Sequence, residues 1–241
     1  MHTTIRVNLP GVRLVAHRGL SGLERENTAS AFVAAGNRSY YGIETDVHLT
    51  RDGRFILIHD ENTKRVSGDE MIVENTAYDT LRALRLPDPG GFARGDLMLP
   101  ALSEYIGICR KYEKVSVLEL KNHFAPEDVQ RVIDLVREMG QLENTVFISF
   151  DLPNMLCLRE KLPDQPLQYL TYDVTDEIIS TLTAHRLDLD TQYTALTEDN
   201  IRLLHQKNIK VNAWTVNDPD VALKLASWGI DLITTNILEN G

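Results

Sequence analysis

The chain has 241 residues, a formal net charge of −10 and 43% hydrophobic residues. This length fits one α/β barrel or two small domains, and the apolar content is sufficient for a sizeable core. The acidic balance argues against nucleic acid or an anionic membrane surface as the partner. No apolar run approaches the roughly 18 residues that a membrane-spanning helix needs.

The first residues, MHTTIRVNLPG, lack the basic-then-apolar layout of a secretory signal. Cys109 and Cys157 are the two cysteines of the chain, and both lie in segments with a helical pattern. We expect them to be free thiols of a reducing compartment, and we therefore expect a cytoplasmic protein. The sequence does not indicate an oligomeric state.

Two apolar runs within residues 14–60 each end in a histidine next to a charged residue, His17 and His59. The segment between them contains Glu44 and Asp46, two residues apart in an apolar run. Alternate residues of a strand share one face, so these two carboxylates are expected side by side. Paired carboxylates suit one hard divalent cation, Mg²⁺ or Ca²⁺.

A hairpin is predicted to bring His59 to the same place. Only residues 51–54 separate the two apolar runs, which is too short for a crossover helix, and Asp52-Gly53 is typical of a two-residue hairpin turn. A turn centred on that pair would place His59 opposite Asp46, on the carboxylate face.

The rest of the chain predicts an irregular TIM (β/α)8 barrel as a single domain, 1–241. A strand at Val12–Ala16 precedes a helix with Asn27 as its N-cap. Residues 61–100 consist of short polar pieces followed by a Gly- and Pro-rich stretch at 87–96, and we interpret them as an insertion or small cap outside the barrel units. Beyond this insertion, strands alternate with capped helices, one of them capped by Asn217, which implies a parallel sheet. Nine strand candidates are expected for eight staves, with 55–59 as a hairpin arm.

Further candidate residues lie where predicted strands end, which is where TIM barrels carry their active sites. Glu119 and Lys121 alternate around Leu120, so both can face the lumen. Glu119 would add a third carboxylate, and Lys121 would add a positive point charge. Arg18 carries a planar guanidinium that could bind an anionic group, and Trp214 ends a later strand.

Several short motifs occur in one order along the chain. They are H-R-G at 17–19, E-N-T at 26–28, I-E-T-D-V at 43–47, T-R-D-G at 50–53, H-D at 59–60, P-A-L-S-E at 100–104, L-E-L-K at 118–121 and V-N-A-W-T-V-N at 211–217. This ordered set resembles the glycerophosphodiester phosphodiesterases over nearly the whole chain.

The resemblance implies metal-dependent hydrolysis of small glycerophosphodiesters to glycerol 3-phosphate and an alcohol. In the family, the positions matching Glu44, Asp46 and Glu119 hold the divalent cation, and those matching His17 and His59 supply acid–base catalysis. Arg18, Lys121 and Trp214 are then expected to bind the phosphate and glycerol parts of the substrate.

Two alternatives stay open. The same site could act on lysophospholipids or phosphoinositide-type esters, or the barrel could be a non-catalytic glycerophosphate-binding protein, which would not need His17 and His59. One departure from the family pattern is Asn236, which replaces an acid at the end of the last strand. We expect it to change hydrogen bonding there without loss of the metal site.

Overall fold

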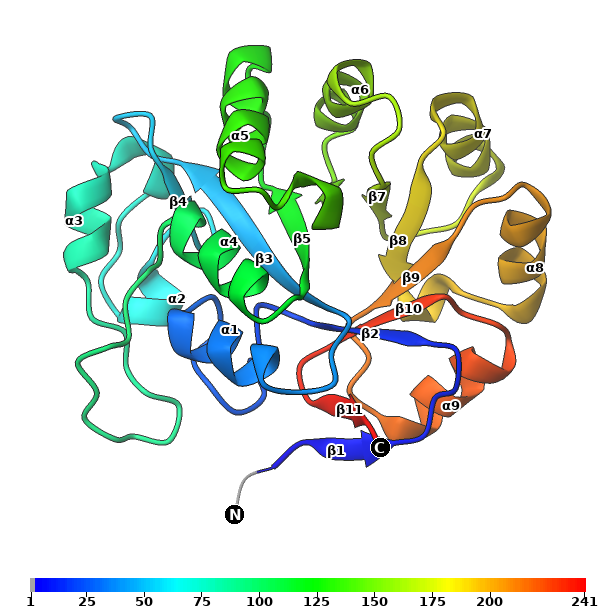
Figure 1. Cartoon of the computed structure of the whole chain (residues 1–241), viewed down its shortest axis with the longest axis horizontal. Coiled ribbons are helices and arrows are strands. Elements are labelled where there is room, and N and C mark those ends of the chain that lie inside the picture. Colours follow the sequence, from blue (N-terminus) through cyan, green and yellow to red (C-terminus); the bar gives the residue numbers. More distant parts are fainter. Residues whose placement is uncertain (1–2) are drawn as a thin grey trace.

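The computed structural model describes residues 3–241 and contains a closed barrel of eight parallel strands surrounded by helices (Figure 1). Around the ring the staves are β2 (Arg13–Ala16), β3 (Gly42–Leu49), β5 (Val115–Leu120), β6 (Thr145–Ser149), β7 (Leu167–Thr171), β8 (Asp188–Gln192), β9 (Val211–Trp214) and β10 (Leu232–Thr235). Parallel pairing of β2 with both β3 and β10 closes the ring. The TIM-barrel expectation is confirmed.

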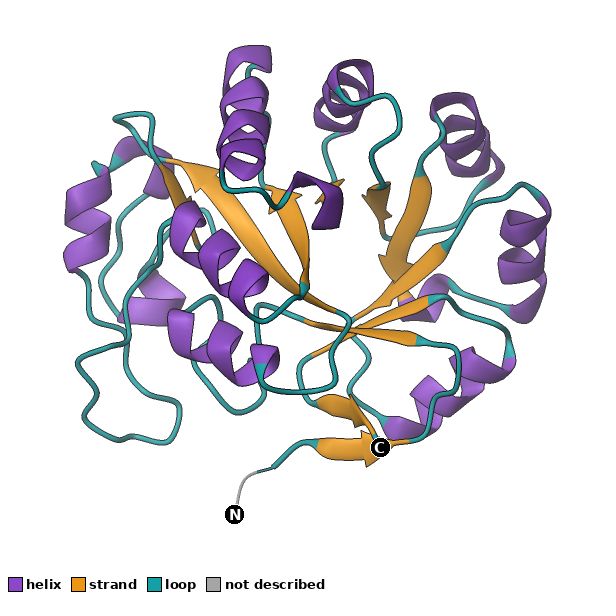
Figure 2. Ribbon diagram, viewed as in Figure 1, coloured by secondary structure: helices purple, strands orange, loops and turns teal. Residues whose placement is uncertain are grey.

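Helices cover the outside of the barrel (Figure 2). They are α1 (Ala29–Gly36), α4 (Leu102–Lys111), α5 (Pro126–Glu138), α6 (Leu152–Lys161), α7 (Asp176–His185), α8 (Glu198–Gln206) and α9 (Pro219–Ser227), with single 3-10 turns at η2 (Leu142–Asn144) and η3 (Tyr193–Ala195). Their apolar faces pack on the strands, and β6 is buried along its whole length because it is covered on both faces.

Alternation along the staves decides which side chains enter the barrel. The inward positions of β5, β6 and β7 carry Val117, Ile148 and Leu170, which pack together in the interior. Positions two residues before or after these on the same strand also point inward, and some of them carry polar groups, among them Glu119 and Gln168. The barrel therefore has a mixed interior, with polar groups held on rigid strands.

The hairpin exists, but its predicted register is wrong by one residue. Strand β4 (Phe55–Leu57) runs antiparallel to β3 and pairs Val47 with Leu57, so Ile58 donates its backbone N–H to the carbonyl of Asp46 at 3.1 Å. The turn is a three-residue loop, with Gly53 at φ +72° after a turn that begins at Thr50. Such a loop adds a glycine bulge, which a two-residue turn does not have.

The insertion, residues 61–100, contains α2 (Lys64–Ser67), η1 (Val73–Asn75) and α3 (Tyr78–Ala83). It packs around an apolar cluster of its own, separate from the barrel core, that includes Ile56 and Ile58 of the hairpin arm. The other members are Val66, Val73, Tyr78, Leu81, Leu84, Leu86, Leu97 and Leu99. Because the cluster includes the arm, the insertion is attached to the segment that carries His59.

Some local expectations are corrected. The N-cap of α1 is Thr28, whose hydroxyl accepts from the backbone N–H of Ala31, and Asn27 precedes it at φ +50°. The N-cap of α9 is Asp218, one residue after the predicted Asn217. A short parallel pair, β1 (Ile5–Val7) with β11 (Leu238–Asn240), was not predicted and joins the two ends of the chain. Among the described residues, none of the helices is both long and apolar enough to cross a bilayer.

Candidate active site

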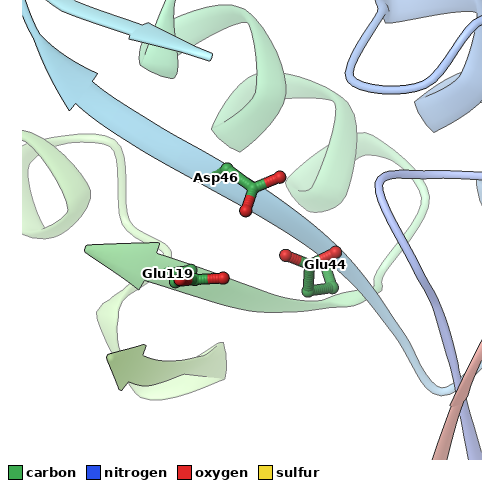
Figure 3. A group of neighbouring side chains, drawn as sticks. All are labelled: Glu44, Asp46 and Glu119. Carbon is green, nitrogen blue, oxygen red and sulfur yellow. The ribbon is translucent and has the colours of Figure 1, made fainter. Parts of the chain in front are cut away.

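Three carboxylates meet inside the barrel at neighbouring staves (Figure 3). Glu44 and Asp46 come from β3, and Glu119 comes from β5 at the position paired with Asp46. One oxygen of each lies within 4.8 Å of the others, and all three residues are buried. Oxygen-only donors at this spacing fit a hard divalent cation and do not select between Mg²⁺ and Ca²⁺.

The electrostatics of the triad favour a bound cation. Burial, and then the charge of Asp46, raises the pKa of Glu44 well above its usual value and that of Glu119 to about 8. Burial alone would also raise the pKa of Asp46, but Lys121 and Arg18 outweigh it and hold that pKa below its usual value. Three buried acids this close cannot all ionise without more positive charge than the two side chains supply.

Lys121 and Arg18 are the two basic side chains at the triad. Lys121 Nζ lies 2.8 Å from Glu119 Oε1 and 3.5 Å from Asp46 Oδ1. The backbone N–H of Arg18 donates to Glu44 at 2.7 Å, and its buried Nε lies 3.5 Å from Asp46 Oδ2 but makes no hydrogen bond to a described residue. The structure therefore brings both predicted basic residues to the carboxylates and leaves one donor unused.

His17, at the end of β2, is held by the residue that departs from the family pattern. Its Nδ1 lies 2.7 Å from Asn236 Oδ1, which also accepts from the Ser21 hydroxyl at 3.0 Å. Since Oδ1 accepts, Nδ1 carries the hydrogen and Nε2 is left with the lone pair when the ring is neutral. Burial and the charge of Arg18 lower the pKa of His17 to about 4.

A chain of charges connects His59 to Arg18 through the insertion. His59 Nδ1 lies 2.7 Å from Asp60 Oδ1, and Asp60 accepts from Arg65 of α2 at 2.7 Å. Arg65 also donates to Glu26 at 2.7 Å, and Glu26 accepts from Arg18 at 2.9 Å. Arg65 of the insertion therefore fixes the carboxylates of Asp60 and Glu26, which in turn orient His59 and Arg18. Sequence reasoning missed it because residue 65 looked like part of a polar surface.

Asn27 was explained in the sequence as a helix cap, but it contacts the site. Its side-chain amide donates to Asp46 Oδ2 at 2.7 Å and accepts from the Thr45 hydroxyl at 2.7 Å. The Asn27 side chain therefore fixes the orientation of the Asp46 carboxylate. Its positive φ, which Asn tolerates better than most residues, is the local feature that marks it as unusual.

Six of the eight predicted site residues line one cavity that opens to solvent, and Asp46 and Lys121 do not. His17, Arg18, Glu44, His59 and Glu119 line one part of it. The rest of the wall is formed by residues on or just after the remaining staves, β6 to β10, namely Ile148, Phe150, Leu170, Tyr172, Asp190, Trp214, Thr215 and Thr234. The cavity is thus charged on one side and mostly apolar on the other.

Trp214 lines the cavity within an aromatic cluster. Its ring meets Phe150 edge to face at 5.8 Å and Tyr172 at 5.6 Å between centroids. Its indole Nε1 is buried with no acceptor among the described residues. The cavity also contains Asp190, which sequence reasoning did not select, because a single acid in an alternating strand is usually solvated.

A barrel whose strand ends gather three buried acids, two histidines and two basic residues around one cavity is the arrangement of an enzyme for an anionic substrate. The chain belongs to the glycerophosphoryl diester phosphodiesterase family, whose model matches residues 17–239. This membership confirms the resemblance and the enzyme class expected from it.

Individual relatives agree. The chain is 28% identical to a glycerophosphodiester phosphodiesterase of Bacillus altitudinis, over 93% of this chain and 94% of that one. It is 29% identical to the mouse lysophospholipase D GDPD3, over 66% of this chain and 49% of that protein. Among solved structures, an Oleispira antarctica phosphodiesterase in complex with the product sn-glycerol-3-phosphate superimposes with a TM-score of 0.87 at 23% identity, covering 93% and 92% of the two chains.

Proposed function

We propose that the protein hydrolyses glycerophosphodiesters to glycerol 3-phosphate and an alcohol, with a divalent cation held by Glu44, Asp46 and Glu119. The observation that carries this proposal is the meeting of the buried acidic triad with His17 and His59 in one cavity. When bound, a divalent cation would neutralise charge on the phosphoryl oxygens and lower the pKa of a bound hydroxyl.

The phosphoryl group needs further positive charge, because the diester carries a negative charge that repels a nucleophile. The unused Nε–H of Arg18 lies beside the triad and can donate to a phosphoryl oxygen through its planar fork. Lys121, now paired with Glu119, can meet another oxygen as a point charge. We assign both residues to phosphate binding, with Trp214 on the glycerol part of the substrate.

His17 and His59 serve as the acid–base pair in this proposal. One takes the proton of the nucleophile and the other gives a proton to the leaving alkoxide. Each ring is oriented through Nδ1, by Asn236 and Asp60 respectively, so that Nε2 is available for proton transfer.

Substrates that differ in their leaving groups test this pair. His17→Ala and His59→Ala should each lower kcat on glycerophosphocholine by about 10²–10⁴-fold. For the histidine that acts as the acid, the loss should shrink on a p-nitrophenyl diester, whose leaving group needs no proton. The other variant should be equally impaired on both substrates. Near-wild-type rates in both variants, with cation bound, would exclude the mechanism.

Lysophospholipids are the second candidate substrate class. The relationship to a mouse lysophospholipase D supports this alternative, as does the apolar cavity wall at Ile148, Phe150 and Leu170. Comparing choline release from glycerophosphocholine and lysophosphatidylcholine separates the two. A higher kcat/KM on the lysophospholipid would favour the second class.

We also propose that the protein works in the cytoplasm, as expected from its cysteines. Cys109 is buried and Cys157 is partly buried, and the two do not form a disulfide. Free thiols of this kind persist in a reducing compartment. Reporter-tagged protein found only in a secreted or periplasmic fraction would overturn this assignment.

A further inference from the structure

Asp190 is a buried acid on the far side of the cavity from the acidic triad. It is 2% exposed and lies on β8, the stave that stands opposite β3 in the ring of eight. Its neighbours in register are Leu170 on β7 and Asn212 on β9. The residue lines the cavity, yet it is too far around the ring to join the cation ligands of β3 and β5.

Asp190 Oδ1 has no hydrogen-bond partner among the described residues. The polar side chains beneath it bond to one another, since Asn212 exchanges hydrogen bonds with Thr234 and donates to Gln168. Burial raises the pKa of Asp190 to about 8, and the Asn212 side chain next to it, which lowers that pKa, offsets burial only in part. Buried polar atoms are rarely unpaired, so an unpaired one beside a cavity is a candidate contact for a ligand group or an ordered water.

A second unpaired group lines the same cavity. The indole N–H of Trp214, on the stave next to Asp190, is buried and lacks an acceptor among the described residues. An indole N–H can only donate, whereas a carboxyl can accept or, when protonated, donate. A ligand hydroxyl has the chemistry to match both groups, because it can accept from an indole N–H and exchange a hydrogen bond with a carboxyl.

Other ligand groups fit less well. A phosphate or carboxylate would accept from Trp214 but would place a second anion beside an acid. An ammonium group would suit an ionised Asp190 but offers the indole no acceptor. The charged side of the cavity already contains the groups suited to phosphate, so the opposite side is left for an uncharged polar part of the substrate.

We propose that Asp190 is a specificity-determining residue that binds the terminal hydroxyl of the substrate's glycerol, with Trp214 as the second partner. The inference rests on the proposed function and goes beyond it. The phosphoryl group is held at β3 and β5, and the hydroxyl farthest from phosphorus extends across the cavity toward β8. An acyl ester at that hydroxyl would remove its hydrogen and enlarge it, so Asp190 also favours the deacylated diester.

Two substrates and two variants test this role. The substrates are glycerophosphocholine and its analogue that lacks only the terminal glycerol hydroxyl. The wild type should prefer the former in kcat/KM by about tenfold to a hundredfold, because the analogue leaves buried groups unpaired. Asp190→Leu, which replaces the carboxyl with an apolar group of similar size, should bring this ratio close to one. Asp190→Asn retains donor and acceptor atoms and should keep most of the preference.

Each other outcome has a definite meaning. An unchanged ratio in Asp190→Leu, or an equal loss on both substrates, would overturn the inference and leave the phosphodiesterase proposal standing. A wild type that does not discriminate between the substrates would do the same. A wild type inactive on both would instead overturn the proposed function, and the inference with it. Inhibition by sn-glycerol 3-phosphate, compared with its terminal-deoxy analogue, should show the same dependence on Asp190.

Discussion

Replacing Asn236 with Asp should raise the pKa of His17. The change puts a negative charge where the amide oxygen now lies, 2.7 Å from His17 Nδ1. Two unit charges about 4 Å apart interact by about 4 kcal/mol at an effective dielectric of about 20, which corresponds to about three pKa units. Arg18 and solvent at the cavity mouth will reduce this effect, so we expect a rise of about 1–3 units from the present value of about 4.

The assay is the titration of His17 followed by NMR, together with the pH dependence of kcat/KM. In Asn236→Asp the protonated ring is favoured, so the limb of the profile that belongs to His17 should move to higher pH, whether the ring acts as acid or as base. Asn208→Asp adds the same charge at the exposed turn before β9, at the other end of the barrel, and should leave the limb in place. An unchanged titration in Asn236→Asp would refute the claim that residue 236 controls this ring.

Three further predictions follow. Arg65→Gln should lower kcat/KM about tenfold or more, because Asp60 and Glu26 lose their shared partner, and should change the melting temperature little. The control Arg202→Gln breaks surface pairs on α8 and should change neither kcat/KM nor the melting temperature. The raised pKa of Asp190 means that the folded wild type keeps a proton that its unfolded state releases, so the wild type should lose stability as pH rises from about 4 to 8. The free energy of unfolding of Asp190→Asn, measured in urea, should therefore increase relative to the wild type over this range. A difference between the two proteins that does not change with pH would contradict this. Shortening Pro87–Asp96 should change KM or substrate preference more than melting temperature, and the reverse result would make the segment structural.

The barrel could be predicted because its signals are local and repeated. Apolar runs such as β6 alternate with capped helices, and this alternation has few other solutions. The carboxylates could be predicted for the same reason, since Glu44 and Asp46 share a face whichever neighbour β3 has. Glu119 could be predicted as the third carboxylate because active-site residues of TIM barrels lie at the C-terminal ends of strands.

The predictions that were wrong or missing depended on single residues or on contacts between distant parts of the chain. A turn that contains Asp-Gly can have two or three loop residues. The loop here has three, with Gly53 at positive φ, so the observed strand register differs from the predicted one by one residue. Thr28 and Asn27 are both good caps, and only the contact of Asn27 with Asp46 distinguishes them. Arg65 and Asp190 gave no signal, because their roles come from partners on other elements.

The central claim is that a divalent cation at the triad supports phosphodiester hydrolysis. The most direct measurement is choline release from glycerophosphocholine by chelator-treated enzyme, as Mg²⁺ or Ca²⁺ is titrated back into wild type and Glu44→Gln. We predict that the treated wild type is inactive and regains its rate saturably with one of the cations, whereas Glu44→Gln stays inactive although its melting temperature shows that it is folded. A treated wild type that keeps its full rate, or a Glu44→Gln variant that recovers like the wild type, would contradict the account.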